Sequence, residues 1–515
     1  MVTPPVLFCL ALLLLLAGAA TARLRPGCRP GPVPKIAEAA ALGAFLAIAA
    51  ATLLIVSGRA GAATGGSGAL LRLDTVGLTL ALLISFIGWI IVRYARTYLD
   101  GETREGWFHA LLSSALAGAI VVAIAGNLLV LLAAFAAVGI TLQRLLRFFP
   151  ERAEARRAAR KFALAWSGGS LAFAMAVLLI GVSTGSSGIP VAAQALEPTT
   201  ASRLAVLLIV VAALLKTASF PVHGWVTEVM EAPTPVSALL HAGIINAGGI
   251  LLLRMADLVQ ANPGAMAILV MVGGFTALFG SAVLLTQSAV KTALAWSTVA
   301  QMGFLMLQCG LGLWTLALLH IVAHSLYKAH AFLSSGTAIE AVAFSRRPGP
   351  VAAPSPAAVA KSFGLAVLLY AAAASLAALV LGPKPPQAFA LGAILIFGVA
   401  YLLAQGLADT APRALAVRTA AASFGAAIAY FLFHALADAL WQHSLPVPPV
   451  PGALEWALVL LALGSFGVVA AAQALFPLWA HHPSTAGLRV HLANGLYANA
   501  LLDRLIGGFK TRQPT

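Results

Sequence analysis

Long apolar segments separated by short polar ones recur from one end of this 515-residue chain to the other. A helix needs roughly 20 apolar residues to cross the hydrocarbon core of a bilayer, and about 15 windows of that length are found. They cover residues 4–22, 37–57, 74–95, 107–125, 127–148, 162–182, 204–228 (interrupted), 235–254, 264–286, 290–309, 313–341, 361–381, 388–407, 415–439 and 454–476. The pattern predicts an all-α polytopic membrane protein with about 14–15 transmembrane helices.

The composition leads to the same class. Hydrophobic residues make up 61% of the chain and charged residues only 9%, whereas a soluble domain carries about 25% charged residues. No polar stretch is long enough to form a soluble domain, so we expect no intrinsic catalysis and assign any catalytic domain to a partner chain. Cys9, Cys28 and Cys309 lack the spacing of a zinc site, and we expect neither a metal nor another cofactor in this chain.

The net charge of +15 would suggest nucleic acid in a soluble protein, but in a membrane protein it is first tested against the cytoplasmic excess of Lys and Arg. Basic residues are concentrated in the loops after the first, fifth, eleventh and thirteenth spans. These are Arg23, Arg25, Arg29, Lys35, Arg152, Arg156, Arg157, Arg160, Lys161, Arg346, Arg347 and Arg413. The alternation predicts an N-terminus outside the cell and a cytoplasmic C-terminal tail. We expect the first apolar run to be retained as a span, because no basic segment precedes it as in a signal peptide.

A lysine lies at the end of an apolar run inside the seventh span. Lys216 follows Leu204 to Leu215 and precedes Phe220-Pro221. A charge at membrane depth is disfavoured by about 2.5 to 3.5 kcal/mol, and such residues face hydrated paths or partners. Pro221 lacks a backbone N–H and predicts a broken helix beside the lysine. Lys216 is therefore predicted to belong to an ion path.

A second group of ionisable residues lies in the eleventh span. His320, His324 and Lys328 follow at four-residue steps, which places all three on one helix face. Imidazole accepts and passes a proton near neutral pH, so the three form a candidate proton relay. The alternative is two hydrogen-bonded core histidines and a lysine that reaches toward the interface. Two histidines four residues apart could also bind zinc, but that face offers no third ligand, which argues against a metal site.

Four further residues are weaker candidates. His241 lies six residues after Pro235. It either continues a polar path from Lys216 or is a core histidine whose ring nitrogens are hydrogen-bonded. Lys291 begins the tenth span and belongs to the path or anchors the helix at the interface. Glu228 and Glu231 are the carboxylates nearest to Lys216 in sequence and are its candidate acidic partners.

The motifs around these residues resemble a known family. KTASFPVHGWVTEVMEAPTPVSALLHAG from residue 216, LDTVGLTL at 73–80, KTALAWSTVAQMGF at 291–304 and HIVAHSLYKAHAFLSSG at 320–336 resemble the proton-conducting membrane subunits of complex I, of cation/proton antiporters and of inorganic-carbon-accumulating complexes. The resemblance implies two inverted five-helix repeats, each with a broken helix, and a central chain of lysines and histidines that conducts protons. It also implies a bacterial inner-membrane location.

The resemblance divides the chain into four parts. Residues 1–69 are N-terminal transmembrane helices, 70–345 the proton-conducting antiporter-like core, 346–476 C-terminal transmembrane helices and 477–515 a cytoplasmic amphipathic tail. In this tail Leu496, Ala500, Leu501 and Leu505 are expected on one face, directed at the membrane, a partner or the protein surface.

Two departures from the family pattern affect the interpretation. The family pairs its first broken-helix lysine with a fifth-span glutamate, and Ala136 stands at that position here. Residues 361–407 also lack the motif that leads into a second broken helix. Within the family, HAGIINAGG, EVMEAPTP and VRYARTYLDG at 92–101 resemble the DabB branch of inorganic-carbon transporters.

That branch implies a function and a partner. The chain is expected to be an ion-translocating, proton- or Na+-driven subunit that energises CO2 or bicarbonate uptake. Its partner would be a DabA-like cytoplasmic subunit that resembles a carbonic anhydrase and holds zinc. The alternatives are a diverged proton-pumping subunit of a complex I, hydrogenase or antiporter assembly, and a scaffold that has lost conduction.

Overall fold

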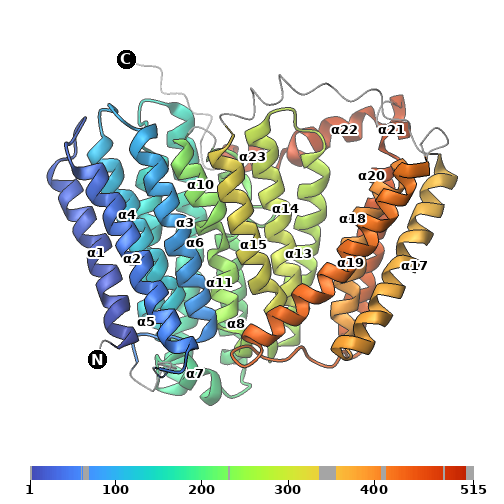
Figure 1. Ribbon diagram of the computed structural model, residues 1–515, viewed down its shortest axis with the longest axis horizontal. Helices are drawn as coiled ribbons and strands as arrows, with labels where there is room; N and C mark the ends of the chain where they lie inside the picture. Colours follow the sequence, from blue (N-terminus) through green and yellow to red (C-terminus); the bar gives the residue numbers. More distant parts are fainter. Residues whose placement is uncertain are drawn as a thin grey trace.

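The computed structural model describes residues 3–59, 61, 69–229, 232–335, 355–406, 413–479 and 482–505. All regular elements within these residues are helices, and two isolated β-bridges join Leu71 to Ala125 and Asn127 to Gly188. Figure 1 shows the long helices standing side by side. The N-terminus lies at one end of the bundle, and the last short helices, from α21 (Phe476–Trp479) to α23 (Ala498–Leu505), lie across the opposite end. We call this opposite end the tail end.

The first two thirds of the chain supply a packed group of helices. They are α1 (Pro4–Leu24), α2 (Val33–Val56), α3 (Thr75–Tyr98), α4 (Glu105–Ile124), α5 (Leu128–Leu146), α6 (Ala153–Thr184), α7 (Ile189–Ala195), α8 (Thr200–Lys216), α9 (Gly224–Thr227), α10 (Thr234–Ala242), the 3-10 helix η2 (Ile244–Asn246), α11 (Ala247–Arg254), α12 (Ala256–Gln260), α13 (Pro263–Leu284), α14 (Val290–Gly310) and α15 (Trp314–Leu333). Their buried side chains share one hydrophobic core.

The remaining helices form a second group and a tail. They are α17 (Pro356–Leu381), α18 (Pro386–Gly406), α19 (Arg413–Trp441), α20 (Ala453–Ala474), α21 (Phe476–Trp479), η3 (Pro483–Thr485), α22 (Ala486–Ala493), η4 (Gly495–Tyr497) and α23 (Ala498–Leu505). Figure 1 places α17–α20 to one side, with α19 running obliquely toward α15. Thr315 donates a hydrogen bond to Asp438 at 2.7 Å, and Trp441 donates one to Thr79 at 2.9 Å, which ties the end of α19 to α15 and α3.

The predicted all-α polytopic fold is confirmed. In the described part of the chain, twelve helices are long and apolar enough to cross a membrane. The helices α8, α14 and α18 occupy the other three predicted windows without meeting those limits of length and hydropathy. The fifteen predicted windows therefore each contain a helix, and the seventh is interrupted as expected.

The interruption lies where the sequence places it. The helix α8 ends at Lys216, the backbone turns through Ala218 at φ 53°, and α9 begins only at Gly224, after Pro221. A non-glycine residue in the left-handed region is uncommon and stops the helix. The neighbouring α10 is also interrupted, at Gly243, before the chain continues as η2 and α11.

Small residues allow the interrupted helices to pack closely. A Cβ added at Gly248 of α11 would lie 2.1 Å from the carbonyl oxygen of Ala213 in α8. Helix packing of this kind, with small residues at the contact, is typical of membrane proteins. The close approach of α11 holds the C-terminal turn of α8, and with it Lys216, in the interior.

The polar face of the tail helix α23 is attached to α6 through the buried Lys161. Lys161 of α6 is fully buried, and its Nζ lies 2.5 Å from Glu228 Oε1 and 2.7 Å from both Asn499 Oδ1 and Asp503 Oδ1. Both tail residues belong to α23, whose Leu501 and Leu505 are 60% and 82% exposed. The amphipathic helix therefore contacts the protein with its polar face and presents its apolar face outward.

We predict that replacing Asp503 with Leu releases α23. The substitution removes one of the two carboxylates that compensate the buried Lys161 ammonium, and breaking a buried pair from one side is destabilising by about 3 to 5 kcal/mol. Limited proteolysis should then cut the tail faster, with the membrane core intact. The control is Asp257→Leu, an exposed carboxylate. Equal cleavage rates for the two variants would contradict the attachment.

Candidate ion path

Lys216 lies in a buried aromatic pocket. It is the last residue of α8 and has no exposed surface. Its Nζ donates to Ser170 Oγ at 2.9 Å and to the Trp166 carbonyl at 3.4 Å. The ammonium also lies 4.1 Å from the Trp166 ring centroid and 4.7 Å from that of Phe135. Aromatic faces attract a desolvated cation, so neutral groups take the place of a carboxylate partner.

Glu228 pairs with a lysine other than Lys216. Glu228 contacts Lys161, and Arg157 Nε lies 3.5 Å from its other oxygen. The sequence-based pairing of Glu228 with Lys216 is therefore corrected: the segment from Pro221 to Thr227 carries Glu228 to the tail end, away from the end of α8. Glu231 lies outside the described residues.

The fifth span offers Lys216 an aromatic ring in place of a carboxylate. Ala136, which stands where the family has its glutamate, is exposed on the outer side of α5. Its neighbour Phe135 is fully buried and faces Lys216. The residue of α5 that meets the lysine is therefore an aromatic ring, and the ring is held by Trp166, whose indole N–H donates to the Phe135 carbonyl at 2.8 Å.

The eleventh-span residues lie on one side of α15, as predicted. His320 Nδ1 hydrogen-bonds Gln308 Oε1 at 2.7 Å, and the His320 and His324 rings are 5.9 Å apart. Lys328 is fully buried and donates to the Leu294 carbonyl at 2.9 Å and to Ser297 Oγ. All of these hydrogen-bond partners belong to α14, so α14 and α15 together form the polar wall.

His241 joins the same wall from α10. Its Nδ1 lies 3.1 Å from Thr298 Oγ1, and its ring stacks on Phe332 with centroids 4.3 Å apart. Thr298 is adjacent to Ser297, the hydroxyl partner of Lys328. His241 and Lys328 therefore hydrogen-bond neighbouring residues of α14. The structure thus brings His241 together with the α15 residues.

Lys291 occupies the first turn of α14 and is half-buried. It lies one helical turn before Leu294, whose carbonyl accepts from Lys328. Lys291 lies at the tail-end terminus of α14. This position agrees with both predictions for Lys291, an anchor at the membrane interface and an entrance to the polar wall.

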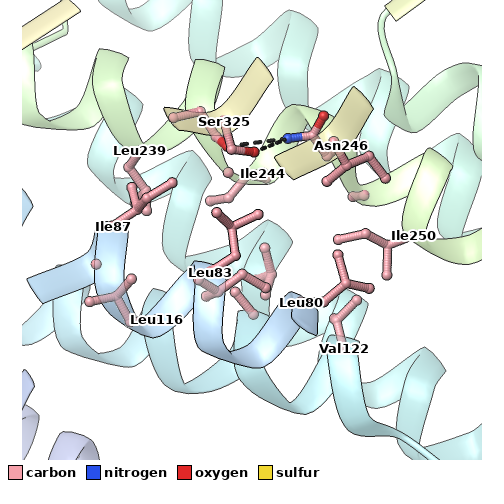
Figure 2. Close-up of a pocket in the computed structure, with 18 of the residues that line it drawn as sticks. Leu80, Leu83, Ile87, Leu116, Val122, Leu239, Ile244, Asn246, Ile250 and Ser325 are labelled. Carbon is pink, nitrogen blue, oxygen red and sulfur yellow. Dashed lines mark hydrogen bonds between the residues drawn. The ribbon is translucent and has the colours of Figure 1, made fainter. Parts of the chain in front are cut away.

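A small cavity lies between the two groups of residues (Figure 2). Its volume is about 40 Å³, and its lining is apolar apart from Asn246 and Ser325, which share a hydrogen bond of 3.1 Å. Phe135 and Trp166, the ring partners of Lys216, also line it. One water needs about 10 to 15 Å³ by this kind of measure. The cavity has room for water between the Lys216 pocket and α15.

Several of these residues were not singled out from the sequence. Trp166 and Ser170 of α6 carry no motif that marks them as lysine partners. Asn246 and Thr298 do lie inside the stretches HAGIINAGG and KTALAWSTVAQMGF, where a polar side chain at membrane depth was the available signal. His223, fully buried within the helix interruption and stacked on Phe220 with centroids 5.8 Å apart, is a further case.

Within the described residues, the partners of Lys216 and Lys328 are hydroxyls, carbonyls and rings, without a carboxylate. No group of His, Cys, Asp and Glu residues suited to a metal is found in the described ranges. Buried titratable groups beside a cavity with room for water suit the passage of protons or cations. The arrangement has the chemistry of an ion path.

Comparison with known proteins places this arrangement in a family. The family model described as NADH:quinone oxidoreductase/Mrp antiporter, transmembrane, matches residues 125–408. The probable inorganic carbon transporter subunit DabB2 of Halothiobacillus neapolitanus is 37% identical over 87% of this chain and 82% of its own length. The probable inorganic carbon transporter subunit DabB of Hydrogenovibrio crunogenus is 40% identical over 56% of this chain and 57% of its own length.

Solved structures agree on the fold. The structure of the Mrp complex from Dietzia sp. DQ12-45-1b matches with a TM-score of 0.59 at 22% identity, over 98% of this chain and 60% of the matched chain. The all-α polytopic fold expected from the sequence is the fold that the two chains share.

We predict opposite stability effects for two buried lysines. Lys216→Met removes a buried charge that has only neutral partners, so the melting temperature should stay the same or rise. Lys161→Met is the matched control, because it leaves Glu228 and Asp503 without their amine and should lower the free energy of unfolding by about 3 to 5 kcal/mol. Thermal unfolding in nanodiscs, followed by tryptophan fluorescence, measures both. An equal loss for the two variants would refute the neutral setting of Lys216.

Proposed function

This chain belongs to the family of proton-antiporter-type membrane subunits found in NADH:quinone oxidoreductases and Mrp antiporters, and to its DabB branch, and we propose on this premise that it translocates protons to energise uptake of inorganic carbon. The observation that carries the proposal is the set of buried lysines and histidines that line one polar wall and face neutral partners. A buried ammonium without a counter-charge is costly, and in membrane proteins it marks an ion pathway.

The proposed route follows the order of the polar side chains along α14 and α15. From the tail end, Lys291 and Lys328 come first, and α15 continues through His324 to His320, which hydrogen-bonds Gln308. Water would bridge the steps that have no direct hydrogen bond. His241 connects through Thr298. Water in the cavity between Asn246 and Trp166 would connect this wall to Lys216 (Figure 2).

The proposed partner is a DabA-like, carbonic-anhydrase-like subunit that binds at the tail end and holds the zinc. Two features support this location. The Arg-rich segment around Arg156 and the tail helix α23 lie at the same end of the bundle, joined through Lys161. An excess of basic residues marks the cytoplasmic side, so we assign the tail end to the cytoplasm and the N-terminus to the outside of a bacterial inner membrane.

The proposed coupling has a direction. Inward movement of protons along the wall would drive a conformational change that reaches the partner through the tail end. CO2 hydration in the partner would thereby become effectively one-way, and bicarbonate would accumulate in the cytoplasm. A second candidate function, cation/proton exchange within a larger assembly, is favoured by the fold match with the Mrp complex.

We predict that Lys216→Ala and Lys328→Ala each abolish growth in ambient air of a strain that lacks carbonic anhydrase and expresses this chain with its partner. The reason is the loss of a protonatable group from the path, with assembly unaffected. Lys35→Ala, an exposed lysine, is the control and should grow as the parent does. Growth of both path variants would leave only a scaffold role.

We predict that an uncoupler stops carbon uptake in the same strain. Collapse of the proton gradient removes the proposed driving force, and uptake is measured with labelled inorganic carbon. Uptake that continues without a proton gradient but ends when Na+ is removed would identify Na+ as the coupling ion. Uptake that depends instead on quinone redox activity would favour a respiratory assembly.

A further inference from the structure

A large cavity opens between the polar wall and the C-terminal group of helices. Its volume is about 760 Å³. One side consists of α14 and α15, with Gln301, His324 and Lys328, and the other of α18 and α19, with Leu395 and Phe433. The cavity therefore has one polar and one apolar wall at membrane depth.

The polar wall has unused hydrogen-bonding capacity. His324 is 5% exposed, and neither of its ring nitrogens has a partner. Lys328 Nζ donates to two oxygens, which leaves the third of its three N–H donors. The residues that line the cavity include no carboxylate. A buried polar group without a partner is rare in proteins and calls for an occupant.

The register of α14 against α15 brings a third group into place. Ser297 bonds Lys328, and Gln308 bonds His320. Gln301 lies one turn after Ser297 on α14, and His324 lies one turn before Lys328 on α15, so the antiparallel register places Gln301 opposite His324. Gln301 is exposed toward the cavity. His324 and Lys328 are separated by one helical turn, a rise of about 6 Å. An ammonium, an imidazole and an amide thus surround a space of small-molecule size.

We propose that this space binds one bicarbonate ion. The negative charge supplies the counter-charge that Lys328 lacks, and the two carboxylate oxygens accept from Lys328 and from the Gln301 amide. The neutral imidazole of His324 has one donor and one acceptor nitrogen, and the hydroxyl of bicarbonate donates to the acceptor. The proposal rests on the proposed function for the identity of the ion, since inorganic carbon is the cargo of that system.

The hydroxyl distinguishes bicarbonate from other planar oxyanions. Formate has the same carboxylate but no hydroxyl, and a carboxylate side chain of a neighbouring subunit would likewise lack the donor. A site that hydrogen-bonds a hydroxyl discriminates strongly against an analogue without it, because its own polar group is then left unpaired. Bicarbonate bound here stabilises the charged form of Lys328, so its occupancy and the protonation of the wall are linked.

The test uses the full chain in nanodiscs and 13C-labelled bicarbonate at a fixed, near-neutral pH, with binding followed by broadening of the 13C resonance. We expect saturable bicarbonate binding, with formate at least about tenfold weaker. Gln301→Leu should weaken bicarbonate about tenfold or more, because a hydrogen bond to a charged group is lost. Gln287→Leu, a glutamine that bonds Thr286 at the tail end, is the control and should bind as the parent does.

Three outcomes would overturn the site. The first is formate that binds as tightly as bicarbonate, which would indicate a pocket for a partner's carboxylate. The second is bicarbonate binding that does not saturate. The third is an unchanged bicarbonate affinity in Gln301→Leu. A third variant, Lys216→Ala, separates this inference from the proposed function. It should bind bicarbonate normally while failing to translocate ions, so loss of ion movement and loss of the bicarbonate site are read independently.

Discussion

The constraint on which the structure depends is the burial of ammonium groups in a medium that cannot solvate them. Lys216 and Lys328 are both fully buried. Coulomb attraction to a carboxylate would be the simplest compensation, but the described partners are hydroxyls, backbone carbonyls and aromatic rings. Such partners stabilise a charge less completely than an opposite charge does. The proposed exchange of protons at these lysines rests on this incomplete compensation.

Lys161 illustrates the other arrangement. It is equally buried, yet Glu228 and Asp503 both contact its amine. Two carboxylates and one ammonium form a fixed network, suited to holding α6, the segment after the broken helix and the tail helix together. One chain therefore contains buried lysines of two kinds, a structural one with opposite charges and two with neutral surroundings. The local set of partners, which burial alone does not reveal, separates the two roles.

The sequence predicted the fold well because membrane insertion leaves a strong pattern. Each of the fifteen apolar windows contains a helix, and Pro221 located the break at Lys216, since both follow from local chemistry. The partners of Lys216 were not predictable, because Trp166 and Ser170 are about fifty residues away and ordinary in composition. Glu228 was assigned by sequence distance, but the helix break redirects the chain and carries it to the tail end. The α15 ladder was predictable from its four-residue spacing, and its α14 partners were not.

The C-terminal group explains why the polar wall remains open. The sequence lacks the motif of a second broken helix in residues 361–407, and α17 and α18 are continuous in the structure over their described lengths. A broken helix would place backbone amides and carbonyls beside α15, where α18 and α19 instead offer Leu395, Ile396 and Phe433. Polar groups of α15 thus face a wall that cannot satisfy them, and hydration or a bound ion must do so. The continuous helix α18 and the unpartnered ring nitrogens of His324 therefore face the same cavity.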